Sequence, residues 1–303
     1  MNDESNFFGL GSIGKRHLKN LISYGKKNSI NFDITAYSSS GKKEFEEITY
    51  IQNRDDLDTH YDIAFITNPT FKHLETLNVI VEKVDYIFLE KPAFSESIDL
   101  TQYNYDYKNI YVAAPLRYKN IMEVVRNSIQ SKKVYSVRAI CSTYLPDWRK
   151  GTDYRNNYSA FKSMGGGVEL DCIHELDYII NLFGFPKSVK KQFGKYSNLE
   201  INSNDLATYI LRYDDKIIEI HLDYFGRVPT RKFQLFTLDE CINVDLLNNK
   251  ISFEENIVKE MPESANDMYE KELKYFFENV VTGKENWNDL YHANEVLKIA
   301  EEK

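Results

Sequence analysis

The chain has 303 residues, of which 42% are hydrophobic and 14% aromatic, enough for one large or two medium packed domains. Its formal net charge is −8 with acids and bases interspersed, which argues against a nucleic-acid-binding protein. No apolar run approaches the ~20 residues that span a bilayer and the N-terminus does not read as a signal peptide, so we expect a cytoplasmic protein without membrane partners.

The first part of the chain alternates strand and helix patterns. Short apolar runs predict strands over 6–8, 32–37, 63–67, 86–89 and 110–114, and helical patterns cover 17–24 and 71–83. Buried strands that are separated by helices are typical of a parallel sheet covered on both faces.

A glycine-rich loop joins the first strand to the first helix. Its glycines are Gly9, Gly11 and Gly14, in the order G-x-G-x-x-G. The first allows a tight turn, the second lets the backbone approach a pyrophosphate, and the third allows close packing of helix and strand. We predict that the loop, with Ser12 and Ile13 at the start of the helix, binds a dinucleotide.

The end of the second strand bears on which nicotinamide dinucleotide is bound. It continues with Ser38, Ser39 and, after two positions, Lys42, and the first carboxylate is Glu44. Hydroxyl and ammonium groups suit a 2′-phosphate, whereas an acid suits a free ribose hydroxyl. The sequence therefore favours NADP(H) over NAD(H), and a solvated turn is the alternative reading.

The pattern changes after about Lys133. Alternating runs predict strands over 134–144, 208–213, 216–224, 232–238 and 242–246, and two helices over 266–281 and 289–301 close the chain. Alternation with tight turns indicates an antiparallel sheet with one covered face. We predict an α/β protein in which residues 1–118 form a Rossmann dinucleotide-binding domain. Residues 119–303 then form a substrate-binding and oligomerisation domain of α+β type with a large, mostly antiparallel open sheet.

A second glycine run, 165–167, opens onto a helical pattern. Asp171, His174 and Asp177 recur every third residue there, so a single helix would place them on one face. An imidazole and two carboxylates beside a close backbone approach suit proton handling next to a ligand. The alternative is a capped helix whose histidine is buried.

Two further motifs complete a resemblance. Leu89-Glu90-Lys91-Pro92-Ala93 follows the strand at 86–89, and Thr67-Asn68-Pro69-Thr70-Phe71-Lys72-His73 follows the strand at 63–67. With the two glycine segments, this order resembles the Gfo/Idh/MocA family of oxidoreductases, named for glucose–fructose oxidoreductase and inositol dehydrogenase. The resemblance implies that cofactor contacts come from Thr67, Asn68, Pro69, His73, Glu90 and Lys91.

The resemblance also implies the reacting groups. Lys91, Asp171 and His174 would line the nicotinamide and the carbon that is oxidised or reduced, with Lys91 or His174 exchanging the hydroxyl proton and Asp171 orienting substrate or imidazole. Many members space the acid and the histidine more widely than the three positions found here. His174 is therefore the firmer of these two assignments, and Glu90 is expected to fix Lys91 in place.

The segment 144–155 carries aromatic and guanidinium side chains. Similar segments occur in family members that are encoded with surface-polysaccharide and nonulosonate sugar genes. Aromatic faces stack on sugars and guanidinium groups clamp anions. We predict substrate contacts from Arg117, Tyr144, Trp148, Arg149, Tyr154, Arg155, Asp171 and His174. The alternative is a loop held together by Arg–Asp pairs.

These features predict an NAD(P)-dependent dehydrogenase or reductase that acts on a sugar CH–OH group, with a nucleotide sugar or sugar acid as substrate. The alternatives are a glycoside-cleaving enzyme of the same fold that uses its cofactor transiently, and a non-catalytic cofactor-sensing regulator. An open sheet face predicts a homodimer or homotetramer. Cys141, Cys172 and Cys241 lack metal-ligand spacing, so we expect reduced thiols and no metal site.

Overall fold

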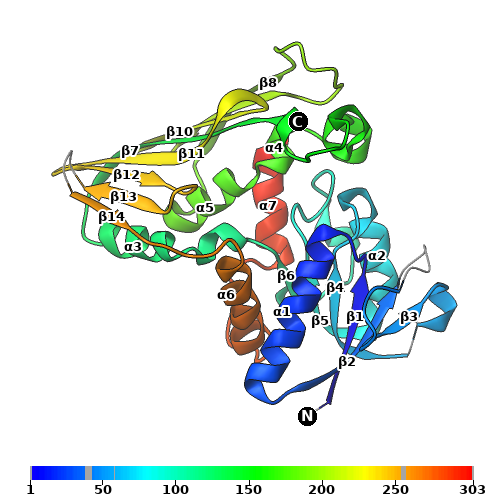
Figure 1. Ribbon diagram of the computed structural model, residues 1–303. Helices are drawn as coiled ribbons and strands as arrows, with labels where there is room; N and C mark the ends of the chain where they lie inside the picture. The colour runs from blue at the N-terminus through cyan, green and yellow to red at the C-terminus, as the bar shows by residue number, and fades with distance from the viewer. Residues whose placement is uncertain (1, 38–42, 58, 254–256, 302–303) are drawn as a thin grey trace. The chain divides into compact units, whose positions relative to one another are not determined.

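The computed structural model describes residues 2–37, 43–57, 59–253 and 257–301. The chain divides into two compact units (Figure 1). The first unit comprises Met1–Pro115 and Tyr269–Glu295, and the second comprises Leu116–Met268 and Val296–Lys303. The division at 115/116 lies near the expected boundary at 118/119, but residues 269–295 return to the first unit, whereas the sequence interpretation kept 119–303 together.

The first unit is built on a six-stranded parallel sheet. Its strands are β1 (Asn2–Phe8), β2 (Asn31–Tyr37), β3 (Thr49–Ile51), β4 (Tyr61–Ile66), β5 (Val84–Leu89) and β6 (Ile110–Val112), in the order β3-β2-β1-β4-β5-β6. Helices α1 (Ser12–Asn28) and α2 (His73–Ile80) connect successive strands (Figure 1). The strand order reverses between β1 and β4, which in open α/β sheets is the point where ligands bind.

Strand β1 is longer than its apolar residues suggest. It pairs with β2 over its whole length, from Asn2 opposite Asn31 to Phe8 opposite Tyr37. The main-chain ladder extends beyond the apolar end of the strand, and it brings the polar residues Ser5 and Asn6 into the interior with no exposed surface. The expected strand over 6–8 was therefore too short.

Aromatic packing explains why residues 269–295 belong to the first unit. Helix α6 (Asp267–Tyr275) runs into a π-helical turn, Phe276–Val280, and Phe276 is fully buried. Its ring centroid lies 5.4 Å from that of Phe88 and 6.2 Å from that of Phe65. Glu272, also fully buried, accepts a 2.9 Å hydrogen bond from the Tyr111 hydroxyl. The segment thus completes the core on one face of the parallel sheet.

The second unit is built on an eight-stranded sheet of order β14-β13-β12-β11-β7-β10-β9-β8. The strands are β7 (Val134–Tyr144), β8 (Ser188–Gly194), β9 (Leu206–Arg212), β10 (Ile217–Asp223), β11 (Phe225–Thr237), β12 (Cys241–Asp245), β13 (Lys250–Phe253) and β14 (Ile257–Glu260). Only β7 and β10 pair in parallel among these described strands. The prediction of a Rossmann-like unit and a mostly antiparallel open sheet is confirmed.

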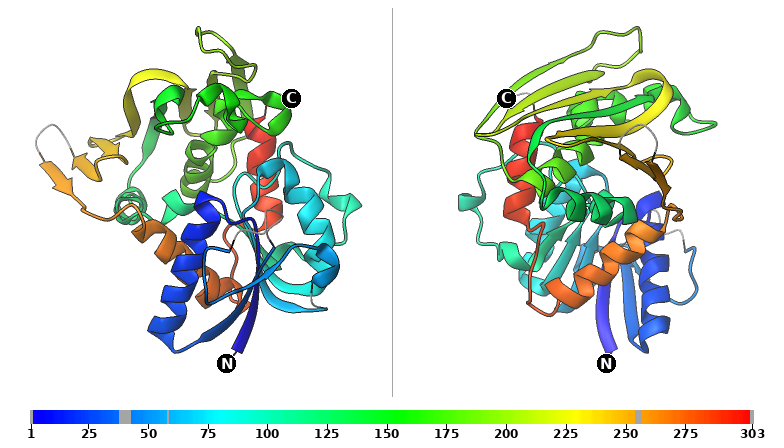
Figure 2. Two further views of the ribbon diagram at one scale, coloured as in Figure 1. Left: turned by 45° about the vertical axis from the view of Figure 1, so that its right-hand side comes forward. Right: turned by 90° about the vertical axis from the view of Figure 1, so that its left-hand side faces the viewer.

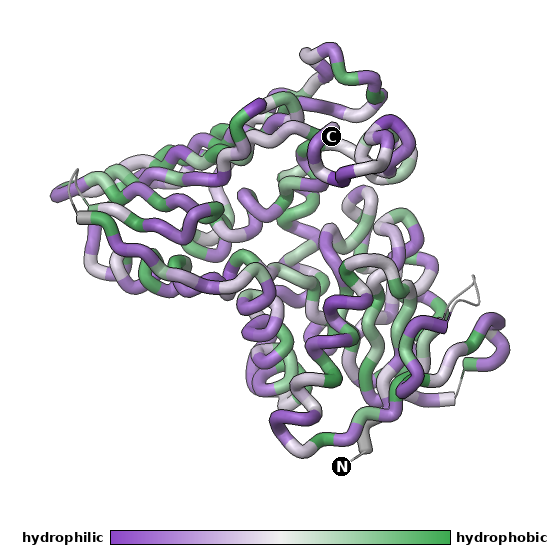
Figure 3. Tube along the Cα trace, viewed as in Figure 1, coloured by the Kyte–Doolittle hydropathy of each residue, from purple (hydrophilic) through white to green (hydrophobic). Residues whose placement is uncertain are grey.

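Helices cover one face of this sheet. They are α3 (Asn120–Ile129), α4 (Val168–Asp171) and α5 (His174–Phe183), which lie on the same side in two orientations (Figures 1 and 2). Tyr178 of α5 packs on Phe233 of β11 at a centroid distance of 5.3 Å. Polar and apolar residues alternate along the strands (Figure 3), as expected for a sheet with one covered face. The last helix is α7 (Leu290–Ala300).

No helix in the described part of the chain has the length and apolar character needed to cross a bilayer.

Candidate active site

The glycine loop of the first unit fits a phosphate group. Gly9 has φ +99°, and a Cβ there would lie 2.7 Å from the Asn68 Cα, while a Cβ on Gly14 would lie 2.1 Å from the Gly9 carbonyl oxygen. A Cβ on Gly11 would meet no described atom within 4 Å. The first and third glycines are therefore required by internal packing, and the second leaves the space that a ligand can occupy.

Helix α1 begins directly after this open position. Gly11 is its N-cap, and among the described side chains none caps it. Its first turn, Ser12-Ile13-Gly14-Lys15, contains no acid. Free N–H groups and the positive end of a long helix attract an anion. The donors present thus suit the pyrophosphate of a dinucleotide.

The residues after β4 hold the loop in place. The Thr67 hydroxyl donates to the Gly9 carbonyl at 2.5 Å, and the Asn68 side-chain amide donates to Thr76 Oγ1 at 2.8 Å. His73 is 1% exposed, and its Nε2 lies 2.9 Å from the Asn68 carbonyl oxygen. Burial lowers the pKa of His73 against the raising effect of these carbonyl contacts. Pro69 is exposed. Thr67 and His73, two of the predicted cofactor residues, are thus buried and make hydrogen bonds within the first unit.

Glu90 has a partner that the sequence interpretation missed. His17 Nε2 lies 2.6 Å from Glu90 Oε1, and the Lys91 backbone N–H donates to Glu90 Oε2 at 3.1 Å. Burial raises the pKa of Glu90, but the hydrogen bond and charge of His17, together with Lys91, outweigh it and hold the pKa below its usual value. The expectation that Glu90 fixes Lys91 has a structural basis in this backbone contact. The only sign in the sequence that His17 has a buried partner is that it is a polar residue on the apolar face of the helix, beside Leu18 and Leu21.

Ser38, Ser39 and Lys42, the predicted contacts to a 2′-phosphate, lie outside the described residues. The nearest described acid, Glu44, lies with its Oε2 2.5 Å from Lys15 Nζ at the start of α1. Its backbone N–H donates to the Tyr50 hydroxyl at 3.0 Å. Glu44 is thus held beside the glycine loop within the first unit.

In the second unit, residues 168–183 do not form one helix. Helix α4 ends at Asp171, α5 begins at His174, and Cys172 between them has φ −100° and ψ 29°. The expectation that Asp171, His174 and Asp177 share a helix face is therefore wrong, because it assumed an unbroken helix. Asp177 points instead to Arg117, whose Nε and Nη2 donate to its two oxygens at 2.8 and 2.6 Å.

Arg117 is buried in this pairing. Its residue exposure is 3%, and both named donors serve Asp177. The guanidinium thus ties residue 117 to α5, and its predicted contact with a substrate stays a prediction.

Asp171 is held by two tyrosines. The Tyr158 hydroxyl donates to Asp171 Oδ1 at 2.8 Å, and the Tyr224 hydroxyl donates to Oδ2 at 2.5 Å. Gly166 packs directly on the turn that carries Tyr158, since a Cβ there would lie 2.3 Å from the Tyr158 carbonyl oxygen. The glycine run therefore permits a close approach within the protein, which is an approach that the sequence interpretation had assigned to a ligand.

Asp171 and His174 line a common cavity of about 280 Å³. The remaining lining residues come from β7, the segment after it, the break between α4 and α5, β11 and the turn after β12: Cys141, Ser142, Thr143, Trp148, Cys172, Pro229, Thr230, Arg231 and Leu247. The cavity thus brings together the carboxylate and imidazole that the sequence singled out, although they lie on different helices.

Most of the side chains in 144–155 that were predicted to contact substrate have partners within the second unit. Arg155 pairs with Asp153 at 2.8 Å and Glu200 at 3.1 Å, and the Tyr154 hydroxyl accepts from the Glu200 backbone N–H. The Arg149 guanidinium lies 5.5 Å from the Tyr158 ring centroid. The Tyr144 ring is covered by Arg227 at 3.8 Å. Of the five predicted residues in this segment, Trp148 is the one that lines the cavity.

Cys141 and Cys172 meet in the cavity wall. Their sulfurs lie 3.6 Å apart, and their positions near Glu175 would suit metal ligands. The Arg231 guanidinium occupies this place, however, with Nη2 3.2 Å from Cys141 Sγ and Nε 2.8 Å from Glu175 Oε1. The hydrogen bond with Cys141, and then burial, raise the pKa of the Cys172 thiol. The cluster is therefore a pair of free thiols beside a fixed cation.

Comparison with known proteins gives a family match for one domain and a fold for the chain. Residues 129–227 match the family model described as the C-terminal alpha/beta domain of the oxidoreductase family, of Gfo/Idh/MocA type. No curated protein matches the chain at the sequence level.

Several solved structures share the fold over nearly the whole chain. UDP-N-acetylglucosamine 3-dehydrogenase GnnA from Acidithiobacillus ferrooxidans superposes with a TM-score of 0.74 at 16% identity, covering 99% of this chain and 96% of that one. The WlbA dehydrogenase from Bordetella pertussis, in complex with NADH and UDP-GlcNAcA, gives 0.72 at 13%, covering 98% and 94%. Levoglucosan dehydrogenase, in complex with NADH and levoglucosan, gives 0.80 at 15%, covering 99% and 95%.

At these identities the superpositions establish the fold. The matched domain confirms, over residues 129–227, the resemblance that the motifs predicted. The chain carries, in residues 129–227, the C-terminal alpha/beta domain of the Gfo/Idh/MocA family of oxidoreductases.

Proposed function

We propose that this protein is a nicotinamide-dinucleotide-dependent oxidoreductase that acts on a CH–OH group of a sugar. The observation that carries the proposal is the cavity of the second unit, which is lined by both Asp171 and His174. The first unit of the same chain supplies an open phosphate loop and a fixed Glu90-Lys91 segment. Solved structures of this fold include UDP-N-acetylglucosamine 3-dehydrogenase and the WlbA dehydrogenase in complex with UDP-GlcNAcA.

The dinucleotide would be held by the backbone of 9–14 and the N-terminus of α1, and when bound it accepts or supplies a hydride. The chain's own part is to bind the sugar and to move one proton at the reacting oxygen. We assign this proton to His174 or Lys91. Asp171 accepts hydrogen bonds at the cavity wall and orients the sugar.

We propose NADP(H) as the preferred cofactor. The support is the sequence after β2, which offers serines and lysines before the first acid, Glu44, and this acid is already paired with Lys15. The related WlbA and levoglucosan dehydrogenases are described with NADH. Titration of both reduced cofactors at modest salt should show tighter binding of NADPH, and equal or tighter binding of NADH would contradict the preference.

The cavity charges refine the substrate class. Arg231 is the lining guanidinium, and it is already committed to Glu175 and Cys141. Arg149, Arg155 and Arg117 have partners in the second unit as well. An uncommitted cation is what a carboxylate would need in a low-dielectric site. We therefore propose that the cavity takes the neutral, hydroxyl-bearing ring of a nucleotide sugar, and that a sugar acid is the weaker candidate.

A substrate screen tests this function. Nucleotide sugars, sugar acids and neutral sugars are mixed with each nicotinamide cofactor, and the reduced-nicotinamide absorbance is followed. A nucleotide sugar should give net turnover. Product formation without a net absorbance change would identify the glycoside-cleaving alternative, and the absence of any reaction in the presence of bound cofactor would support the regulatory one.

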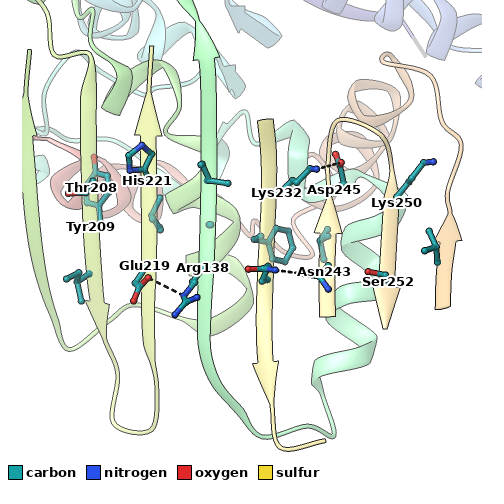
Figure 4. Close-up of a pocket in the computed structure, with 18 residues that line it drawn as sticks. Arg138, Thr208, Tyr209, Glu219, His221, Lys232, Asn243, Asp245, Lys250 and Ser252 are labelled. Carbon is teal, nitrogen blue, oxygen red and sulfur yellow. Dashed lines mark hydrogen bonds and ion pairs between the residues drawn. The ribbon is translucent and has the colours of Figure 1, made fainter. Parts of the chain in front are cut away.

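We also propose that two copies associate through the open face of the eight-stranded sheet. That face forms a shallow hollow of about 880 Å³ in which charged pairs alternate with apolar side chains (Figure 4). Arg138 pairs with Glu219 and Lys232 with Asp245, while Ile210 is 47% exposed. A surface that carries both charges complements its own copy across a twofold axis. Sedimentation should show a dimer or tetramer that Ile210→Glu dissociates and Leu238→Glu, at an exposed turn, does not.

A further inference from the structure

The carboxylate of Asp171 is bonded at both oxygens by phenol groups from different parts of the second unit. Tyr158 lies in a short turn before the glycine run and reaches Oδ1 at 2.8 Å. Tyr224 lies between β10 and β11, has no exposed surface, and reaches Oδ2 at 2.5 Å. Asp171 itself is 8% exposed and lines the cavity. Its orientation is thus set by two side chains that are remote in sequence.

Both phenols are protonated donors under ordinary conditions. Burial raises the pKa of Tyr224, and the charge of Asp171 raises it further. The same two causes, in the same order, raise the pKa of Tyr158. Because each tyrosine stays protonated, its O–H donates the hydrogen bond and Asp171 accepts both bonds. Hydrogen bonds to a charged group are about twice as strong as bonds between neutral groups.

The aromatic segment after β7 supports this arrangement from behind. The Trp148 ring meets Tyr224 edge-on at a centroid distance of 5.3 Å, and its indole N–H donates to Thr143 Oγ1 at 2.6 Å. The Arg149 guanidinium lies over the Tyr158 ring. Gly166 allows the Tyr158 turn to approach α4. Residues that the sequence interpretation offered to the substrate therefore pack on the two phenols.

We infer that Tyr158 and Tyr224 are positioning residues that fix the Asp171 carboxylate in the cavity wall, where it accepts a hydrogen bond from a sugar hydroxyl. The inference rests on the proposed function and deepens it. It also accounts for the close spacing of Asp171 and His174. Asp171 stands at the end of α4, before the break, so its direction is set by the two phenols and is independent of the register of α5.

Single hydroxyl deletions test the inference. Tyr158→Phe and Tyr224→Phe should each lower kcat/KM for the sugar by about tenfold or more, since each removes one bond to a charged acceptor, and cofactor affinity should be unchanged. Tyr178→Phe is the matched control. Tyr178 is fully buried in the same unit, and its hydroxyl has no hydrogen-bond partner among the described residues. The control should retain wild-type kcat/KM.

The two phenols should act only through Asp171. In an Asp171→Ala background, both tyrosine substitutions should therefore have no further effect on kcat/KM. If they lower kcat/KM there as much as in the wild type, or if Tyr178→Phe is equally damaging, the positioning role is wrong.

A spectroscopic measurement tests the contact without any turnover. Tyrosines labelled at Cζ are observed by NMR near neutral pH, and the two signals are assigned as those missing from Tyr158→Phe and Tyr224→Phe. Both signals should change position in Asp171→Asn, because the charged acceptor of both hydrogen bonds is gone. Unchanged positions would overturn the contact itself. If both signals move in Asp171→Asn but the wild type oxidises no sugar, the proposed function is wrong and the contact stands.

Discussion

A buried histidine links the two motifs of the first unit at the scale of single residues. His17 lies three positions beyond Gly14 and has no exposed surface. Its contact with Glu90 at 2.6 Å joins the helix that follows the phosphate loop to the segment that carries Lys91. The glycine loop with its helix and the Glu90-Lys91 segment are therefore joined by a hydrogen bond.

His17→Gln tests this link through the pH dependence of stability. The pKa of Glu90 is lower in the folded protein, so its ionisation adds stability above its unfolded pKa of about 4.3, and this stability is lost as pH falls through the folded value. We expect His17→Gln to cost about 3 kcal/mol near neutral pH, because it leaves a buried charge without its partner. The difference from wild type should shrink below about pH 4.

Urea unfolding at several pH values measures this. Lys27, on the same helix as His17, forms an exposed pair with Glu270 of α6. Lys27→Gln breaks this pair, is the control, and should cost less than about 1 kcal/mol. A His17→Gln cost that is independent of pH would contradict the assigned role of Glu90.

At the scale of elements, the first unit depends on a segment from the end of the chain. Phe276 joins an aromatic cluster with Phe65, Phe88 and Tyr111, and Tyr24 stacks on Phe277 at 4.7 Å. The π-helical turn at 276–280 places these two successive rings toward the core side of the unit.

Phe276→Ala should lower the free energy of unfolding by about 3–5 kcal/mol, because it opens a cavity among these rings. Phe71, which is 44% exposed in the same unit, provides the control, and Phe71→Ala should change the stability by less than about 0.5 kcal/mol. Equal effects in chemical denaturation would mean that residues 269–295 are not part of this core.

Regular patterns in the sequence predicted the elements that obey them. Strand β7 was expected and observed at 134–144, because its alternation is long and regular. The strands β8, β13 and β14 were missed, since they are lysine-rich or only four residues long. The break after Asp171 was missed because the apolar pattern continues across it.

The same reasoning applies to the site. The glycine loop and Glu90-Lys91 were predictable from local motifs. The partners of these residues were not. His17 lies 73 positions from Glu90, and Tyr224 lies 53 positions from Asp171, so no local periodicity relates them. The arginines in 144–155 were predicted to contact substrate, but the sequence did not show that Arg155 pairs with both Asp153 and Glu200.

At the scale of the whole molecule, the chain forms its first unit from two separate stretches. A chain that ends at residue 118 lacks Glu272 and Phe276, and it leaves the aromatic cluster of β4, β5 and β6 uncovered. We expect this fragment to bind a hydrophobic dye and to show no cooperative thermal transition, whereas the full chain unfolds cooperatively. A cooperative fragment would show that residues 269–295 are dispensable.

The central claim is that the chain oxidises or reduces a sugar with Lys91 and His174 as its proton-handling groups. The most direct measurement is the change in reduced-nicotinamide absorbance with the best nucleotide sugar, for the wild type, Lys91→Ala and His174→Ala. We predict net turnover by the wild type and a loss of about 10²–10⁴-fold in kcat for whichever residue exchanges the proton, with cofactor still bound. Full turnover by both variants, or no absorbance change with any sugar, would contradict the account.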